Sequence, residues 1–509
     1  MRFAVAPQVD AGITMIELLA GLTNIDAMPD VGVTGLSLDS QEVKPGYLFV
    51  ALAGIKTHGM NFVAEAIRKG TVAVIYDPGK GGEQLTSPFR YSSHIPFLAV
   101  EKLDQKVGFI ADRYFGHPSA YMDVIGITGT NGKTSCSFFI AQALKAEKRC
   151  TVSGTLGWGP VESLEATSHT TPDAITGHSR LAEMYRHGSE VVAMEVSSHG
   201  QSQGRVNGVR FRGALFTNFS RDHLDYHGSE TAYLAAKLRF LQVPGLKFAA
   251  VNLDDSSAGK ILSVVPANVR VLGFSRKQVQ AHVEMVVASK VRQDSKGIAF
   301  EVEHGGEVAD VSAPVYGDFN VENLLATVTV LLGMEFSLIK AAALVGNVRP
   351  VPGRMERFDQ GLHRPSVIVD YAHTPHALES VLTALRQHCR GKLWAVFGCG
   401  GDRDQGKRPE MGRIAKRLAD RIVLTDDNPR SEDGDAIVNE ILVGCRGASV
   451  EIIRDRKKAI WQAIGGAKSE DIVLIAGKGH EAIQQIGVNK FPFSDRKEVR
   501  EALLSQSEQ

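Results

Sequence analysis

The chain has 509 residues, which is too long for one hydrophobic core and predicts about two to four domains. Its 43% apolar and 22% charged residues are typical of a soluble globular protein. The 57 basic residues balance 57 acidic ones, so the overall charge does not indicate a nucleic acid or a membrane surface as partner. An anionic ligand would have to be held by local placement of charge.

The cysteines and the N-terminus indicate the compartment. Five cysteines, scattered without metal-ligand spacing, fit reduced thiols better than a disulfide framework: Cys136, Cys150, Cys389, Cys399 and Cys445. The N-terminal MRFAVAPQVDAG lacks the sustained apolar stretch of a signal peptide, and no apolar run approaches a membrane span. We therefore expect a soluble cytoplasmic protein. A monomer is a separate expectation, which these features do not test.

The first hundred residues predict a small unit of strands and helices. Apolar strands separated by Gly/Pro turns are expected at residues 33–40, 47–54 and 71–78, with a helix at 62–70 before the third. From about residue 101 a helical linker leads into the next apolar strand.

That strand opens onto a glycine-rich loop, GITGTNGKTSCS, at residues 126–137. Strand, glycine loop, Lys, Thr and helix is the order that cradles polyphosphate, because backbone N–H groups and the helix dipole favour an anion. Lys133 would reach the phosphates and Thr134 could hold Mg²⁺. The strict P-loop pattern requires glycine where Ile127 stands, and Gly126 and Gly129 flank that position instead, so this loop is a variant.

Further strands are expected at 191–198, 213–220 and 248–255, with helical segments between them. Continuous apolar strands alternating with helices favour a parallel sheet covered on both faces. Residues 270–315 alternate differently and predict an antiparallel insertion.

Prolines and glycine interrupt the pattern at 347–358, and a second series of strands follows at 366–372, 393–400, 421–427, 450–455 and 471–477. Helical segments follow the first four of these strands, which predicts a second doubly wound unit without a GxGxxG fingerprint. The fold class is therefore α/β with three domains, at 1–101, 102–350 and 351–509. The central one is a P-loop parallel-sheet ATPase domain and the last a Rossmann-like doubly wound domain.

Two strand ends in the middle domain carry groups that could take part in chemistry. Glu195 lies in AMEVSSHG and His223 in TNFSRDHLDYHG, where open α/β sheets bind ligands. Taken alone, Glu195 could equally be a carboxylate paired with a surface base, and His223 a structural histidine. Together with the phosphate loop they indicate a metal site, since Thr134 and Glu195 supply the oxygen ligands that Mg²⁺ needs.

A set of ordered motifs resembles the Mur ligases of peptidoglycan synthesis. They are TGTNGKTS, HTTPD, MEVSSHG, TNFSRDHLDYHG, YLAAKLRF, FNVENLLA, PVPGRMERF, DYAHTP, GCGGDRDQGKRPEMG, TDDNPR and AGKGHE. The match runs from LSLDS at residue 36 to SDRKEV near 494, and the family's phosphate motif is G-T-N-G-K-T, which explains the variant loop.

The resemblance implies ATP-dependent amide formation through an acyl phosphate on a substrate carboxylate. It places the ATP phosphates on Gly129, Thr130, Asn131, Gly132, Lys133, Thr134 and Ser135, and adenosine-side contacts at Asn323, Arg354 and Asp370. One Mg²⁺ would lie near Thr134 and Glu195, and a second would use His223 and a carbamylated Lys237. Without the resemblance, Lys237 would be interpreted as a solvated helix lysine.

The resemblance also implies the acceptor, UDP-N-acetylmuramoyl-L-alanyl-D-glutamate, bound by a UDP-sugar-binding N-terminal domain. Its contacts would be Leu38, Ser40, Thr170, Thr171, Ser197, Gln203 and Arg205, with Lys56 and Thr57 as further candidates. The amino-acid pocket of the C-terminal domain would contain Arg403, Asp427, Asn428, Pro429, Arg430, Gly477 and Glu481.

The stretch DNPR, residues 427–430, indicates which amino acid is added. Asx and proline residues favour a turn for local reasons, but a turn does not explain Arg430. A guanidinium can clamp the distal carboxylate that meso-diaminopimelate has and lysine lacks, and Glu481 could pair its distal ammonium. We therefore expect meso-diaminopimelate. The alternatives are the same ligase adding lysine, a folylpolyglutamate-type ligase, a P-loop ATPase or switch of another class, and a binding-only protein.

Overall fold

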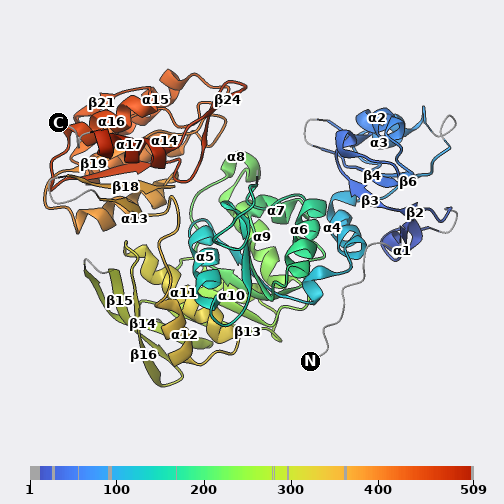
Figure 1. Cartoon of the computed structure of the whole chain (residues 1–509), viewed down its shortest axis with the longest axis horizontal. Coiled ribbons are helices and arrows are strands. Elements are labelled where there is room, and N and C mark those ends of the chain that lie inside the picture. Colours follow the sequence, from blue (N-terminus) through green and yellow to red (C-terminus); the bar gives the residue numbers. More distant parts are fainter. Residues whose placement is uncertain are drawn as a thin grey trace.

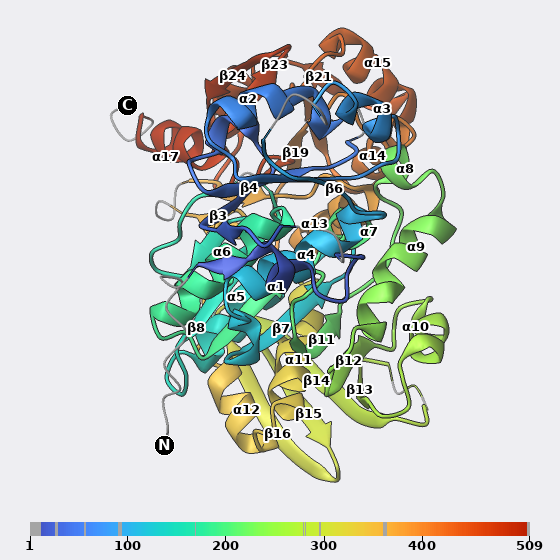
Figure 2. The same cartoon turned by 90° about the vertical axis from the view of Figure 1, so that its right-hand side faces the viewer.

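A computed structural model describes residues 12–25, 29–54, 57–89, 94–167, 169–277, 279, 281–294, 297–359 and 364–505. Three main sheets follow one another along the chain and form three parts (Figure 1). In both views the N-terminal and C-terminal parts lie toward the end of the central part where helix α8 is found (Figures 1 and 2).

The N-terminal part is built on a four-stranded parallel sheet of order β3-β4-β5-β6. Its elements are β1 (Ile13–Thr14), α1 (Met15–Leu19), β2 (Gly32–Val33), β3 (Gly35–Ser37), β4 (Tyr47–Ala51), α2 (Val63–Arg68), β5 (Ala73–Tyr76), α3 (Gly82–Thr86) and β6 (Phe97–Ala99). The three predicted strands and the helix are confirmed, and β6 was not predicted. Helix α4 (Leu103–Tyr114) is the predicted helical linker.

The central part is a ten-stranded sheet with the order β16-β15-β14-β13-β12-β11-β7-β10-β8-β9. Its strands are β7 (Asp123–Thr128), β8 (Cys150–Gly154), β9 (Gly157–Gly159), β10 (Val191–Glu195), β11 (Phe211–Phe216), β12 (Phe248–Asn252), β13 (Arg270–Ser275), β14 (Glu284–Asp294), β15 (Gly297–His304) and β16 (Glu307–Ala313). Its helices are α5 (Lys133–Leu144), α6 (Ala174–Arg186), α7 (Ser198–Ser202), α8 (Leu224–His227), α9 (Glu230–Leu238), α10 (Ala258–Val264), α11 (Phe319–Gly333) and α12 (Leu338–Val345).

The strands of this sheet are apolar throughout because helices cover both faces. Side chains of α5, α11 and α12 pack with Ile125 and Ile127 of β7 on one face, whereas α6, α9 and α10 pack with Val124 on the other. Strand β7 lies between β10 and β11 and is parallel to both, so the carboxyl ends of these three strands meet at one edge. That edge is where an open α/β sheet binds its ligand.

The predicted antiparallel insertion at 270–315 is only partly right. Strand β15 is antiparallel to both β14 and β16, but β13 runs parallel to both β12 and β14. These strands therefore extend the central sheet and do not form a separate unit. The alternating sequence reflects an edge of the sheet with one solvated face, and it does not report where parallel pairing stops.

The C-terminal part is a six-stranded sheet of order β17-β18-β22-β19-β20-β21. Its elements are β17 (Glu356–Phe358), β18 (Ser366–Asp370), α13 (Pro375–Arg386), β19 (Leu393–Phe397), α14 (Lys407–Leu418), β20 (Arg421–Leu424), α15 (Gly434–Cys445), β21 (Val450–Ile452), α16 (Arg456–Gly466), β22 (Ile472–Ala476), β23 (Ile483–Ile486), β24 (Asn489–Pro492) and α17 (Asp495–Ser505). Helices α13, α14 and α15 cover one face, and α16 and α17 the other. The predicted doubly wound unit is confirmed.

All five cysteines are free thiols. None of the described helices combines the length and the apolar character that a membrane crossing requires.

Candidate active site

The glycine loop between β7 and α5 is held in shape by the end of β11. Gly129 and Gly132 have φ values of +140° and +86°, and a Cβ on Gly129 would lie 1.9 Å from Thr217 Oγ1. The backbone N–H of Thr130 donates to Asn218 O at 2.9 Å. Ile127, where the strict P-loop has glycine, is a buried residue of β7, so the loop starts two residues later in this chain. The loop backbone is therefore preformed for an anion.

Two lysines converge on one carbonyl of this loop. Lys133 Nζ donates to Gly129 O at 2.8 Å and to Thr130 O at 2.9 Å, and Lys237 Nζ donates to Gly129 O at 2.7 Å. Lys237 is only 1% exposed, and its Nζ lies 4.7 Å from the centroid of the Tyr233 ring. Burial and then the nearby Lys133 charge hold the pKa of Lys237 well below its ordinary value, and burial also lowers the pKa of Lys133.

Thr134 and Glu195 form the predicted oxygen pair. Thr134 Oγ1 donates to Glu195 Oε1 at 3.0 Å and accepts from Arg354 Nη2 at 3.1 Å. The Glu195 side chain is 1% exposed and also accepts from the backbone N–H and the hydroxyl of Thr155, at 2.9 and 3.0 Å. Two hard oxygen donors beside a phosphate loop suit Mg²⁺, which usually takes one or two carboxylates and completes its shell with water and phosphate oxygens.

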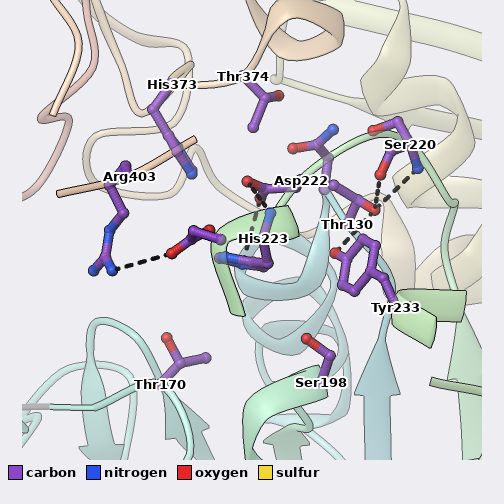
Figure 3. A network of polar contacts seen from close by, with 12 residues as sticks. Thr130, Thr170, Ser198, Ser220, Asp222, His223, Tyr233, His373, Thr374 and Arg403 are labelled. Atoms are coloured by element: carbon purple, nitrogen blue, oxygen red, sulfur yellow. Dashed lines mark hydrogen bonds and ion pairs between the residues drawn. The ribbon is translucent and has the colours of Figure 1, made fainter. Parts of the chain in front are cut away.

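His223 stands at the start of α8 in a left-handed backbone conformation, with φ of +53°. Its Nε2 lies 3.4 Å from Asp222 Oδ2, and its ring centroid lies 5.8 Å from that of Tyr233 (Figure 3). The same Tyr233 ring faces Lys237. Burial lowers the pKa of His223 to about 3. Burial acts to raise the pKa of Asp222, but His223, His373 and Lys407 outweigh it and hold that pKa at about 2. A neutral imidazole thus sits beside an ionised carboxylate.

The predicted adenosine-side residues border the loop. Asn323 lies against Gly132, where an added Cβ would be 2.7 Å from Asn323 Oδ1. The Arg354 guanidinium stacks 4.4 Å from the centroid of the Tyr371 ring. Asp370 accepts the backbone N–H of Met355 at 2.7 Å, and burial raises its pKa. A small cavity beside these groups is lined by Ser135, Phe139, Val315, Tyr316, Asn320, Pro350, Val351, Arg354 and Met355.

The predicted substrate residues of the central part meet around Glu195. Thr171 Oγ1 donates to Glu195 O at 2.9 Å and accepts from Ser197 N at 3.0 Å. Arg205 donates to Gln203 Oε1 at 2.9 and 2.6 Å and to Thr171 O at 2.8 Å. Thr170 and Thr155 share a hydroxyl hydrogen bond of 3.0 Å. This set therefore adjoins the phosphate loop.

The N-terminal candidates are not joined to that set by hydrogen bonds among the residues that the structure describes. Ser40 Oγ donates to Glu65 Oε2 at 2.7 Å, and Leu38 is half-buried in the same part. Thr57 Oγ1 accepts from Asn61 Nδ2 at 2.9 Å, and Lys56 lies outside the described residues.

The predicted amino-acid residues gather at the carboxyl ends of β19, β20 and β22. Arg430 has φ of +54°, and its Nη1 donates to Gly401 O at 2.7 Å. A Cβ on Gly400 would touch Arg430 Nη1 at 2.8 Å and Arg403 Cγ at 3.7 Å, so both guanidinium side chains flank this glycine. Pro429 continues the same turn, and its carbonyl accepts from Glu432 N at 3.2 Å.

The other members of this group are tied together by a lysine that sequence reasoning missed. Lys478 is fully buried, and its Nζ donates to Asn428 Oδ1 at 3.0 Å and to Glu481 Oε2 at 2.8 Å. Asn428 Nδ2 also donates to Glu481 Oε2 at 2.9 Å. Asp427 lies against Gly477, where a Cβ would be 2.5 Å from Asp427 Oδ2. The sequence feature that could have identified Lys478 is its place between the two glycines of AGKGH.

The loop of residues 221–225 joins the nucleotide side to the C-terminal part. Arg221 pairs with Asp404 at 3.2 Å, and Arg403 Nη1 lies 3.9 Å from Asp225 Oδ2 (Figure 3). Sequence reasoning also missed Asp222 in this loop, as well as Asn320, which accepts from Asn323 Nδ2 at 2.8 Å. Both stand inside matched motifs, RDH and FNVENLLA, next to residues that were predicted.

His480, next to Glu481, makes the site acid-sensitive. Its Nδ1 is buried and has no hydrogen-bond partner among the residues that the structure describes, and burial together with Arg354, Arg496 and Lys478 lowers its pKa to about 3. The pKa of this histidine is about 6.5 in the unfolded chain and about 3 in the folded chain. Between these values the unfolded chain binds a proton that the folded chain does not, so the free energy of unfolding falls as the pH drops from 6.5 toward 3. The loss is at most about 1.4 kcal/mol per pH unit.

We therefore expect calorimetry to show a larger fall of the unfolding temperature between pH 7 and pH 5 in the wild type than in H480Q. H388Q, a change at an exposed histidine, is the control and should behave as the wild type does. Equal falls in the wild type and H480Q would contradict this account of His480.

Comparisons with known proteins agree with this geometry. Three family descriptions match the chain: "Mur ligase family, catalytic domain" at residues 32–102, "Mur ligase middle domain" at 127–331 and "Mur ligase, glutamate ligase domain" at 353–479. A protein of Alkalilimnicola ehrlichii named UDP-N-acetylmuramoyl-L-alanyl-D-glutamate--2,6-diaminopimelate ligase is 45% identical, with 96% of this chain and 98% of the relative covered. A protein of the same name from Coxiella burnetii is 44% identical, with 93% and 96% covered.

A solved structure of a ligase with this name superimposes with a TM-score of 0.68 at 35% identity and covers 97% of this chain and 99% of its own. Similarity thus extends through all three parts and includes both the phosphate loop and the Arg430 turn. The chain belongs to the Mur ligase family.

Proposed function

We propose that this chain is the ATP-dependent ligase that adds meso-diaminopimelate to UDP-N-acetylmuramoyl-L-alanyl-D-glutamate, in cytoplasmic peptidoglycan precursor synthesis. One observation carries the proposal. A phosphate-binding loop in the central part and a pocket with two guanidinium groups and a carboxylate in the C-terminal part approach each other across residues 221–225. The relatives that match nearly the whole chain carry this activity in their names.

The three parts suggest a division of labour with bounds at 1–101, 102–350 and 351–509. The first would bind the UDP-sugar, the second the nucleotide and the acceptor carboxylate, and the third the amino acid. Because one chain supplies both the nucleotide loop and the amino-acid pocket, a monomer is sufficient for the reaction.

The phosphoryl step depends on positioning and charge neutralisation. The loop N–H groups from Gly129 to Ser135 would hold the ATP phosphates. Lys133 would exchange its contacts with the loop carbonyls for the γ-phosphate, which the acceptor carboxylate attacks to give the acyl phosphate. Thr134 and Glu195 would hold Mg²⁺, which when bound offsets the negative charge of the phosphates.

Lys237 is suited to carry a carbamate. Burial and the nearby Lys133 charge lower the pKa of Lys237 and so favour its neutral amine, which can add to CO₂ and lose a proton to form an anionic group with two oxygens. The charge of that carbamate would be paired by Lys133, which shares the acceptor Gly129 O with Lys237. With His223, which faces the same Tyr233 ring, the modified lysine could hold a second Mg²⁺.

Selection of the amino acid would depend on Arg430. Its guanidinium flanks Gly400 and is half-buried, so it can offer two parallel N–H groups to the distal carboxylate of meso-diaminopimelate. Glu481, oriented by Lys478 and Asn428, can pair the distal ammonium. Lysine would leave Arg430 without its anionic partner, and each charge-assisted hydrogen bond lost is worth roughly 1.5–3 kcal/mol.

The test is amide formation by the purified protein with ATP, the UDP-sugar dipeptide and either amino acid. We expect meso-diaminopimelate to be preferred, and R430A to lower kcat/KM for it by roughly tens to hundreds of fold while leaving the slow use of lysine unchanged. R430K keeps the charge without the planar fork and should recover only part of the loss.

The rival functions give different outcomes in the same assay. If lysine outcompetes meso-diaminopimelate, or if R430A uses it undiminished, the pocket assignment is wrong. A P-loop ATPase of another class would release phosphate at the same rate with and without the UDP-sugar dipeptide, whereas the ligase should require it.

A further inference from the structure

A histidine of the C-terminal part faces the loop of residues 221–225 in the central part. His373 lies in the loop between β18 and α13, and its ring points toward Asp222 of the central part (Figure 3). The ring is half-buried and packs edge-on against Tyr371, with the ring centroids 4.6 Å apart. The backbone beside it is held as well, because Lys407 Nζ donates to His373 O at 2.9 Å. The imidazole is therefore fixed in orientation.

The hydrogen bonds determine which ring nitrogen is available. His373 Nδ1 lies 2.8 Å from Tyr371 O, and since a carbonyl oxygen can only accept, Nδ1 carries the proton. A neutral ring then leaves Nε2 with a lone pair. Within the described ranges no hydrogen bond to Nε2 is found, and this nitrogen is not among the buried unpaired atoms. Nε2 is thus available as an acceptor.

Four titratable or charged groups from different segments surround this ring. Lys407 at the start of α14, Arg354 before β17 and His480 after β22 lie on the C-terminal side, and Asp222 faces it from the loop before α8. Burial and then Lys407 lower the pKa of His373, while Asp222 acts in the opposite direction. The imidazole is consequently neutral near neutral pH, and an ionised carboxylate faces it.

The amide-forming step requires such a group. The amine of a free amino acid arrives mostly as ammonium at neutral pH and must lose a proton before its nitrogen can attack a carbonyl carbon. His373 lies between the phosphate loop and the residues of the predicted amino-acid pocket, which the reaction must bring together. Tyr371 packs against His373 on one side and under Arg354 on the other, and Arg354 reaches Thr134 of the phosphate loop. Tyr371 also contacts His480, the neighbour of Glu481 in the amino-acid pocket.

We infer that His373 is the general base of amide formation, accepting at Nε2 a proton from the incoming ammonium, while Asp222 stabilises the imidazolium that results. This inference rests on the proposed ligase function. The ammonium gives one proton to His373, and the free amine then attacks the acyl phosphate carbon. The C–N bond forms as the C–O bond to phosphate breaks, the nitrogen passes a second proton to the departing phosphate, and His373 returns its proton to water.

The test replaces the incoming amino acid by an amine that needs no base. Hydroxylamine is largely unprotonated at neutral pH and can trap the acyl phosphate as a hydroxamate. In H373N, whose amide can keep the bond to Tyr371 O, and in H373Q, amide formation with meso-diaminopimelate should fall by about 10²–10⁴-fold. Hydroxamate formation and the accompanying ADP release should stay close to the wild-type rates. H376Q, at an exposed histidine three residues along the chain, should leave both reactions unchanged.

A pH profile provides a second readout. In H373N the remaining rate with meso-diaminopimelate should rise about tenfold per pH unit, because only amine that is already deprotonated can react. Equal loss of both reactions in the variants, or an unchanged rate with meso-diaminopimelate, would overturn the inference. A wild type that forms neither amide nor hydroxamate would instead refute the ligase function itself.

Discussion

Replacing Lys237 by methionine should lower kcat for amide formation by about 10²–10³-fold, because the carbamate that would hold the second Mg²⁺ is lost. Lys237 is buried to 1% exposure, and its Nζ lies between Gly129 O and the Tyr233 ring. Methionine has a similar length and is apolar, so the fold should survive. The measurements are kcat for amide formation and ¹³C NMR after incubation with labelled bicarbonate. A carbamate signal is expected in the wild type and not in K237M.

The control is K260M, which removes an exposed lysine from α10 of the same part and should change neither readout. A K237M protein that turns over at the wild-type rate would refute the role of this lysine. Loss of activity without a carbamate signal in the wild type would show instead that the unmodified amine is the active form. The two readouts therefore separate the residue from its modification.

Most of the fold could be predicted because its strands are buried on both faces. Such strands appear as continuous apolar runs bounded by turns, as in β7, β10 and the series from β18 to β22, and the helices between them complete the pattern. The strand β6 was not predicted, although β3 and β21, which also have three residues each, were, so strand length alone does not explain the omission. The predicted antiparallel range began too early, at residue 270, because alternation identifies a solvated face and does not identify the direction of the neighbouring strand.

The residues of the candidate site could be predicted from the sequence, but the hydrogen bonds between them could not. Motif matching identified Lys133 and Lys237, yet only the structure shows that both donate to the same carbonyl. That carbonyl, Gly129 O, is 108 residues from Lys237 along the chain. Asp222 and Lys478 were missed because a charged residue in a loop is usually solvated. Their significance comes from burial and from partners on other elements. Such long-range contacts depend on the tertiary fold and leave no local pattern.

Replacing Lys133 by methionine should lower kcat by about 10³-fold, since a cation that stabilises a transferring phosphoryl group contributes at least this much to the rate. The matched control is K145M at the other end of α5, where the lysine side chain is 66% exposed. The rate to measure is the single-turnover formation of ADP with the UDP-sugar dipeptide and no amino acid, which isolates the first chemical step. We expect this step to be slowed as much as the complete reaction.

The separate effects of K133M on kcat and on the KM for ATP show how Lys133 acts. In the structure its Nζ is already satisfied by Gly129 O and Thr130 O, at 2.8 and 2.9 Å, so moving it to a phosphate exchanges one set of hydrogen bonds for another. Such an exchange adds little to the binding of ATP in the ground state. The lysine stabilises the complex only when negative charge develops on the transferring group. K133M should therefore lose kcat with a small change in the KM for ATP. A raised KM with an unchanged kcat would mean that Lys133 binds the nucleotide equally in the ground and transition states.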